Sequence, residues 1–383
     1  MNPLQQKIIE KIKKEGPVTF RTFMEMALYE PELGYYTSQK TRIGKSGDFY
    51  TSSHLHPAFG IMIGKQIEEM WEVMGRPSAF QIVEMGSGAG YLCKDILEYY
   101  RGLGIGGLGL EREIIKNLQY VIVELNPLMR ESQKNLLYEF SDKVRWVSSI
   151  KELSAIRGCI LSNELLDAFS VHIIEMNDEI EEIFVSTDNE KLTEIKGAPS
   201  TSGITDYLKE FSIELEKGHR TEINLEIKKW LSEINRALTE GFILTIDYGY
   251  SSEDYYSEDR NRGTMLCYHE HQVTEGPYQN IGKQDITAHV NFSSLKKWGD
   301  ELSINTIGFC LQGTFLVSLG IDEVIAEIHK IHKNSDYPFE VARIKKLILP
   351  GTMGETHKVI IQYKGCRKPA LRGFAIKNQM REL

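Results

Sequence analysis

The 383-residue chain lacks the features that would tie it to a disulfide framework or a membrane. Its five cysteines are scattered and form no C-x-x-C pair, which disfavours both a set of disulfides and a zinc knuckle and favours a reducing compartment. No stretch approaches the roughly 18 apolar residues that a membrane-spanning helix needs. The N-terminal MNPLQQKIIEKIKKEG mixes acids with lysines, so it resembles neither a secretory signal nor a transit peptide. We therefore predict a cytoplasmic protein without a membrane span.

Basic charge is also in short supply. Lys and Arg number 45 against 54 Asp and Glu, and the net charge of -9 argues against a nucleic-acid partner. The exception is the end of the chain, where six basic residues from Lys364 onward face only Glu382. We predict that residues 365–383 form a basic, solvated tail.

A metal centre is not indicated either. The closest approach to a ligand pattern is H-x-H, in His54 with His56 and in His269 with His271. A pair of this kind without a third ligand nearby is a weak signal, and hydrogen-bonded loop histidines are the simpler interpretation. We predict no metal.

The middle of the chain alternates between short apolar runs of strand character and amphipathic helical segments. FQIVEM, QYVIVEL and VRWV are predicted strands, and YLCKDILEYY and NPLMRESQKNLLYEF are predicted helices between them. GFILTIDYG is expected to resume the buried strands, and HKVIIQYKG to be the last strand of the sheet. Alternation of this kind is typical of an α/β fold, so we predict a doubly wound, mostly parallel, Rossmann-like sheet over residues 76–364.

Two regions are available to shape a substrate site around this core. Residues 1–75 are predicted as an N-terminal helical and lid region, in which the irregular, glycine-rich stretch 32–53 is the candidate lid. The core is interrupted at about 170–235 by an inserted α+β substrate region. Within it, VHIIEMNDEIEEIFVS is predicted to be a hairpin added to the main sheet.

The segment VEMGSGAGYL places three glycines, Gly86, Gly88 and Gly90, where a predicted strand turns into a helix. Glycines permit a close backbone approach, and the free N–H groups at such a turn suit an anionic or carboxylate group.

The same turn also indicates which cofactor it binds. A dinucleotide fingerprint needs a further glycine where Tyr91 stands, which weakens the interpretation as an NAD site. Glu84 would repel pyrophosphate but attract a cationic amino group. The pattern E-x-G-x-G-x-G resembles motif I of class I S-adenosyl-L-methionine (SAM) methyltransferases, and we predict that Ser87 of the same loop also binds SAM.

The next predicted strand ends at Glu124, where folds of this type place an acid for the two ribose hydroxyls. The spacing from the glycines is longer than usual because RGLGIGGLGLERE intervenes. That segment holds a formal G-x-G-x-x-G, but it follows a helix, so we interpret it as a linker.

Further segments, in the order in which they occur, resemble the MidA-like methyltransferases, a family that includes a mitochondrial arginine methyltransferase assisting respiratory complex I assembly. The resemblance runs from residue 27 to about 295 and extends to GTMGETHKVI near 351. One departure is that Ser53 and His54 stand where the family usually has Pro and Glu, so a glutamate that would orient a substrate cation is missing. The matching segments are ALYEPELGYY, GDFYTSS, VEMGSGAGYL, SNELLDAFSV, IDYGY, GTMLCYHEH and GKQDITAHVNF.

The resemblance implies a class I methyltransferase fold and a set of site residues. SNELLDAF follows a predicted strand, so its acids should lie at the sheet edge beside the cofactor. Helix capping is the alternative role for these acids, and on physical grounds alone GKQDITAHVNF is predicted to be a capped helix. The implied catalytic residues are Glu164, Asp167 and Asp48, the implied cofactor residues include Gly47 and Asn163, and the implied substrate residues are Phe49, Tyr248, His271 and Asp285.

These features together predict a SAM-dependent methyltransferase that acts on an arginine side chain of a protein, with a respiratory-complex subunit as the candidate acceptor. A small-molecule N- or O-methyltransferase is the first alternative. A non-catalytic SAM-binding assembly factor is the second, and a dehydrogenase ranks last. A homo-oligomer is left open.

Overall fold

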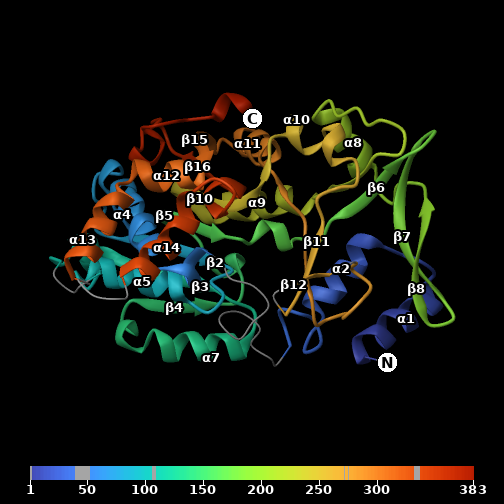
Figure 1. Cartoon of the computed structure of the whole chain (residues 1–383), viewed down its shortest axis with the longest axis horizontal. Coiled ribbons are helices and arrows are strands. Elements are labelled where there is room, and N and C mark those ends of the chain that lie inside the picture. The colour runs from blue at the N-terminus through green and yellow to red at the C-terminus, as the bar shows by residue number, and fades with distance from the viewer. Residues whose placement is uncertain (1, 39–51, 106–108, 271, 275, 332–336) are drawn as a thin grey trace.

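The computed structural model describes residues 2–38, 52–105, 109–270, 272–274, 276–331 and 337–383. Its centre is an eight-stranded sheet (Figure 1). The strands are β2 (Phe80–Met85), β3 (Leu118–Val123), β4 (Val144–Val147), β5 (Ile156–Asn163), β10 (Leu238–Tyr250), β14 (Val290–Asn291), β15 (Asn305–Leu311) and β16 (His357–Lys364). Their order is β15-β16-β10-β5-β2-β3-β4, and β14 pairs with the end of β10.

This sheet confirms the predicted doubly wound architecture. Strands β4, β3, β2, β5 and β10 run parallel, and β16 is antiparallel to both β10 and β15. The chain builds outward from β2 to β3 and β4, then returns to add β5 and β10 on the other side. In sheets of this type ligands bind at the carboxyl ends of the strands where the direction of building reverses, which is here between β2 and β5.

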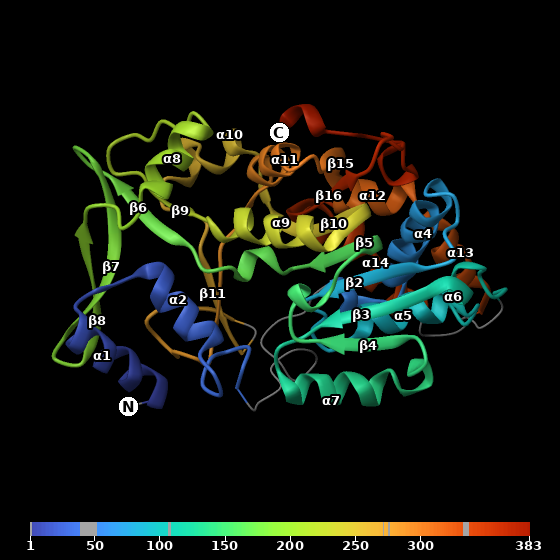
Figure 2. The same cartoon turned by 180° about the vertical axis from the view of Figure 1, so that it is seen from behind.

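Helices cover both faces of the sheet, because successive strand residues point to opposite sides. Ile82 packs into the core on one face and its neighbour Val83 into the core on the other. The first face carries α4 (Ala58–Val73), α5 (Tyr91–Tyr100), α12 (Gln312–Ser318), α13 (Ile321–Ile331) and α14 (Tyr337–Ile348). The second carries α8 (Ser202–Glu210), α9 (Glu226–Ala237) and α11 (Phe292–Glu301). In Figure 2, α7 (Pro127–Leu136) lies along the β4 edge.

A second sheet stands beside the core. It comprises β1 (Val18–Thr19), β6 (His172–Met176), β7 (Ile180–Asp188), β8 (Lys191–Gly197) and β9 (Arg220–Ile223). The hairpin of β6 and β7 was predicted, but the prediction that it joins the main sheet is wrong. Its apolar side chains pack instead on α1 (Pro3–Glu15) and α2 (Phe20–Tyr29), so the insertion and the N-terminal helices share a core of their own.

Two further predictions need correction. Residues Asp285–Thr287 are not the start of a capped helix but strand β13, which is buried and pairs with β11 (Leu266–His269) in a small sheet completed by β12 (Gln272–Thr274). The C-terminal segment is not simply a solvated tail, because Leu371 and Phe374 are buried in the main core and Phe374 packs on Phe315. Hydrogen bonds from the backbone N–H groups of Arg372 to Glu69 and of Gly373 to Gln66 hold the same segment.

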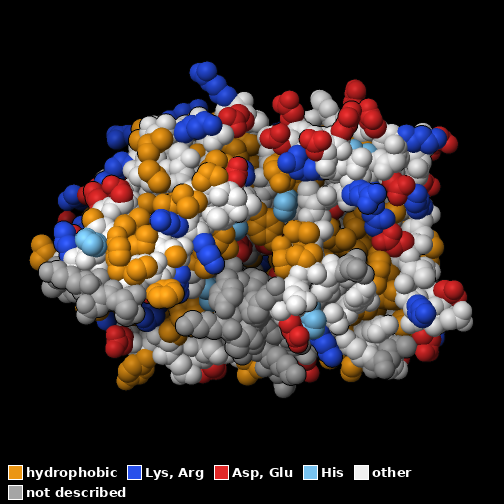
Figure 3. All heavy atoms as spheres, in the orientation of Figure 1, with side chains coloured by type: hydrophobic (Ala, Val, Ile, Leu, Met, Phe, Trp, Pro, Cys, Tyr) orange, Lys and Arg blue, Asp and Glu red, His pale blue; other side chains and the backbone are white. Residues whose placement is uncertain are grey.

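The remaining helices are short: α3 (Ser52–Leu55), α6 (Ile114–Asn117), α10 (Ser252–Tyr255) and α15 (Met353–Thr356). In the part of the chain that the structure describes, no helix has the length and apolar character required to cross a bilayer. Figure 3 shows that the face seen in Figure 1 is hollowed near its centre, where hydrophobic side chains and histidines gather.

Candidate active site

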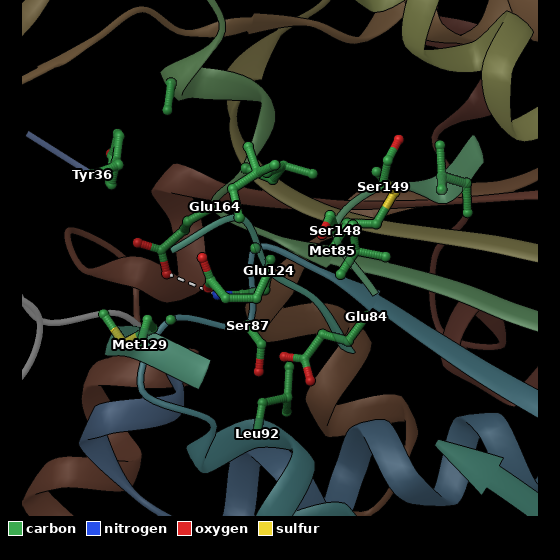
Figure 4. A pocket seen from close by; sticks show the side chains of 18 of the residues that line it. Tyr36, Glu84, Met85, Ser87, Leu92, Glu124, Met129, Ser148, Ser149 and Glu164 are labelled. Carbon is green, nitrogen blue, oxygen red and sulfur yellow. Dashed lines mark hydrogen bonds between the residues drawn. The ribbon is translucent and has the colours of Figure 1, made fainter. Parts of the chain in front are cut away.

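A cavity of about 350 Å³ lies at the carboxyl ends of β2, β3, β4 and β5. Its size is in the range of small-molecule sites, about 300–1,000 Å³. In Figure 4, Tyr36 lies at one end and Ser148 and Ser149 at the other, with Glu164 and Glu124 between them. The predicted site residues in its lining are Glu84, Gly86, Ser87, Gly88, Glu124, Asn163 and Glu164.

The glycine turn has the backbone shape that the sequence predicts. Gly86, Gly88 and Gly90 have φ angles of 73°, 53° and 87°, in the left-handed region that favours glycine. A Cβ atom on Gly86 would lie 2.8 Å from Cδ1 of Leu165. Gly90 is the N-cap of α5, so the free N–H groups of this helix start beside the turn. This cradle fits the amino-acid end of SAM.

Two carboxylates flank the cradle. Glu84 is buried, accepts a hydrogen bond from the Tyr120 hydroxyl at 2.7 Å, and has its pKa raised by burial to about 7. Burial also raises the pKa of Glu124, which accepts a hydrogen bond from the backbone N–H of Asn126 at 2.8 Å. Gln133, which the sequence did not single out, donates to the Gly88 carbonyl at 2.7 Å and reaches Glu124 at 3.4 Å. Gln133 therefore ties the glycine turn to the predicted ribose acid.

Glu164 follows β5 in a strained conformation, with a φ of 52°. Its backbone N–H donates to the Ile246 carbonyl at 2.8 Å, which fixes the turn to β10. Its Oε1 atom accepts hydrogen bonds from the backbone N–H of Ser52 at 3.1 Å and from Nδ2 of Asn163 at 3.2 Å. No hydrogen bond joins Oε2 to any other residue that the structure describes. One oxygen of this cavity-lining carboxylate is held and the other is available.

Three more predicted residues lie behind this lining. Asp167 is buried and accepts a hydrogen bond from the Tyr248 hydroxyl, and burial raises the pKa of its carboxyl to about 7. Asp285 is buried too, and accepts from the Tyr36 hydroxyl at 2.8 Å. Among the residues described, these three and Gly90 are outside the lining of the cavity. Asp285 thus supports Tyr36, which does line the cavity, whereas Asp167 and Tyr248 contact each other behind it.

Tyr29 and Tyr36 form a wall of the cavity that the sequence reasoning missed. Their rings are stacked, with centroids 5.6 Å apart and planes 25° apart. The Tyr29 hydroxyl donates to the Ala168 carbonyl at 2.8 Å, and the Tyr36 hydroxyl to Asp285. Both hydroxyls thus have hydrogen-bond partners. The sequence feature that could have identified Tyr29 and Tyr36 is their position in ALYEPELGYY, one of the segments that resemble the family.

The remaining predicted residues cannot be placed. Gly47, Asp48, Phe49 and His271 lie outside the described residues. Ser53 and His54, which replace the family's Pro and Glu, do line the cavity. Ser148, Ser149 and Ile150, which follow β4, also line it and were not predicted.

The strand order, the glycine turn after β2, and the carboxylates of Glu84 near the end of β2 and Glu124 just after β3 define a class I methyltransferase that uses SAM. Residues 62–310 match the model of a family described as "Putative S-adenosyl-L-methionine-dependent methyltransferase", and the chain belongs to this family. The cofactor is SAM. The predicted fold class, cofactor and general activity are confirmed, as is the resemblance to MidA-like methyltransferases.

Individual relatives extend this result. The protein arginine methyltransferase NDUFAF7 of Homo sapiens is 27% identical, over 84% of this chain and 74% of that protein. The protein of the same name in Danio rerio is 27% identical, over 91% and 84%. A crystal structure from Burkholderia thailandensis, bound to S-adenosyl-homocysteine, is 27% identical with a TM-score of 0.88 and covers 99% of this chain and 96% of that one.

The same comparison corrects one prediction. The chain was expected to be cytoplasmic, but the named relatives are mitochondrial proteins. Scattered cysteines show only that a compartment is reducing, so they did not discriminate between these two locations.

Proposed function

We propose that the protein transfers the methyl group of SAM to an arginine side chain of a protein. The observation that carries the proposal is that the two carboxylate oxygens of Glu164 differ. Its Oε1 accepts hydrogen bonds from Ser52 and Asn163, whereas its Oε2 is left for an acceptor. The relatives named as protein arginine methyltransferases support it. A subunit of a respiratory complex is the candidate acceptor.

The chemistry is a displacement in which the S–CH₃ bond breaks, an N–CH₃ bond forms and the guanidinium loses one proton. Bound SAM supplies a methyl group made electrophilic by the sulfonium. Oε2 of Glu164 accepts a guanidinium N–H, orients the nitrogen and takes the proton. Tyr29 and Tyr36 present ring faces to the planar cation and exclude water. The protein thus works mainly by alignment.

A small-molecule N- or O-acceptor is the second candidate. It is favoured by Ser53 and His54, which line the cavity in place of the family's Pro and Glu. A smaller or neutral acceptor would not need the missing carboxylate. A protein that binds SAM without turnover is the third candidate.

The test is incubation of the full chain with methyl-labelled SAM and a mitochondrial protein extract, followed by acid hydrolysis and identification of labelled methylarginine. We expect label in methylarginine with the wild type and little with Glu164→Gln, which should still bind SAM in a calorimetric titration. Glu253→Gln, a substitution of an exposed glutamate in α10, is the matched control. Label confined to metabolites would favour the second candidate, and SAM binding without any label the third.

A further inference from the structure

His357, the first residue of β16, lies directly behind Glu164. The side chain is buried, and its Nε2 atom is 3.6 Å from Oε1 of Glu164. Among the described residues, Nε2 has no hydrogen-bond partner, and His357 is outside the lining of the cavity. A buried imidazole nitrogen without a partner calls for an explanation, and the carboxylate next to it supplies one.

The other ring nitrogen is also engaged. Nδ1 of His357 lies 3.0 Å from Oγ1 of Thr356, which is 3.3 Å from the Thr352 carbonyl. The single hydrogen of the Thr356 hydroxyl can point to the Thr352 carbonyl or to Nδ1, and the contact with Nδ1 is the shorter of the two. With the hydroxyl donating to Nδ1, the neutral ring carries its proton on Nε2, the nitrogen that faces Glu164.

The surrounding charges favour a donor at this point. The carboxyl groups of Glu164, Asp167 and Asp247 interact closely enough to raise the pKa of Asp247, after the larger effect of burial. The neighbouring His289 is kept neutral, because burial and nearby cations lower its pKa to about 4. Lys358 donates to the Glu355 carbonyl at 2.7 Å and so is committed elsewhere. His357 is therefore the imidazole placed to serve this cluster of acids.

We propose that His357 is a positioning residue for Glu164, and that its Nε2–H, oriented by the Thr356 hydroxyl, joins Ser52 and Asn163 in holding Oε1. The proposal rests on the acceptor role of Glu164 given above. Three donors on one oxygen lock the carboxylate and direct Oε2 to the acceptor. The 3.6 Å contact shortens when the site is filled, as active-site hydrogen bonds commonly do on ligand binding.

The first test needs no acceptor. In ¹⁵N spectra of the histidines of the full chain, we expect His357 in the Nε2–H form, and we expect its Nε2 signal to move in Glu164→Gln. In Thr356→Val the fraction in that form should fall, and Thr356→Ser should restore it. An Nδ1–H form in the wild type, or an Nε2 signal indifferent to Glu164→Gln, would overturn the proposal even if methyl transfer to arginine proved correct.

The second test uses the initial rate of label transfer to the mitochondrial extract. We expect His357→Leu to lower the rate about 10- to 100-fold, with SAM affinity unchanged, and His357→Gln to recover part of it. In a Glu164→Gln background His357→Leu should cost nothing further, since both act through one group. Losses of rate that add in the double variant would contradict the proposal.

The matched control is His172→Leu. His172 pairs with buried Glu182 at 2.7 Å outside the cavity, so this substitution should lower the stability of the protein and leave the rate of label transfer unchanged.

Discussion

Oδ2 of Asp247 accepts a hydrogen bond from the backbone N–H of Leu166 at 2.9 Å. The same oxygen accepts from Leu165 at 3.2 Å, so the end of β10 holds the turn that carries Glu164. Asp247 is itself fully buried beneath the turn.

Asp247→Ala is therefore expected to destabilise the protein. It leaves buried N–H groups without an acceptor, each at a cost of about 1–3 kcal/mol, and frees the Glu164 turn. Urea unfolding should show a loss of several kcal/mol, and the rate of methyl transfer should fall even where the variant is folded. Asp259→Ala, at an exposed aspartate, should change neither quantity. If Asp247→Ala were as stable as wild type, the turn that carries Glu164 would not depend on hydrogen bonds to Asp247.

The parts that sequence predicts well are those fixed by local pattern. The alternation around Ile82 and Val83 specifies a strand buried on both faces, and the glycine turn needs only its own backbone angles. The hairpin at 171–186 was recognised, but its partner was not, because the helices covering it come from residues 3–29. Asp285 was misread for the same reason, since its strand is defined by pairing with Tyr268. A strand or helix that packs against a segment far away in the sequence leaves no trace of that partner in its own local pattern of residues.

SAM affinity should depend on pH through Glu84. In the free protein burial raises the pKa of this carboxyl to about 7, so it is largely protonated at pH 6. The amino group of SAM favours the ionised form, hence binding should release a proton and weaken as pH falls from 7 to 5, by at most about tenfold per pH unit. Calorimetry at pH 5, 6 and 7 in buffers of different ionisation enthalpy measures both effects. Glu84→Gln should flatten the profile, and a flat wild-type profile would exclude this role.

The glycine cradle can be tested with a matched pair of substitutions. Gly86→Ala forces a Cβ to within 2.8 Å of Leu165 at a φ of 73°, and should weaken SAM binding more than tenfold. Gly16→Ala also imposes backbone strain, at a φ of 89° and a ψ of -178°, with nothing within 4 Å of the new atom. Both should lose about 1–3 kcal/mol of stability from the backbone. Only the first should lose SAM in calorimetry, and equal affinities would show that the turn does not hold the cofactor.

The stacked tyrosines give a prediction about the acceptor. Tyr36→Leu removes a ring face from the cavity wall, so a cationic acceptor should bind about 2- to 30-fold more weakly, the range expected for a cation–π contact of about 0.5–2 kcal/mol. Tyr36→Phe keeps the ring and loses only the hydrogen bond to Asp285. Its acceptor KM should lie closer to wild type. Tyr138→Leu, at an exposed tyrosine, is the control. A neutral acceptor would be indifferent to Tyr36→Leu.

The last prediction concerns stability alone and rests on Asp95 in α5. This carboxyl is buried, its Oδ2 has no hydrogen-bond partner among the described residues, and burial raises its pKa to about 7. A carboxyl with a raised pKa keeps its proton in the folded state where the unfolded chain loses it. Its contribution to stability is therefore present below about pH 4 and is lost as pH rises towards 7.

Asp95→Asn removes this titration. We expect the free energy of unfolding to match wild type at pH 4 and to exceed it by about 1–3 kcal/mol at pH 8, because a buried charge is replaced by a neutral amide. Urea denaturation at the two pH values measures the difference. Asp142→Asn, at an exposed side chain, should show none. An Asp95→Asn protein no more stable than wild type at pH 8 would mean that the folded state solvates or pairs the ionised carboxyl, and that its burial is not the dominant effect on its protonation.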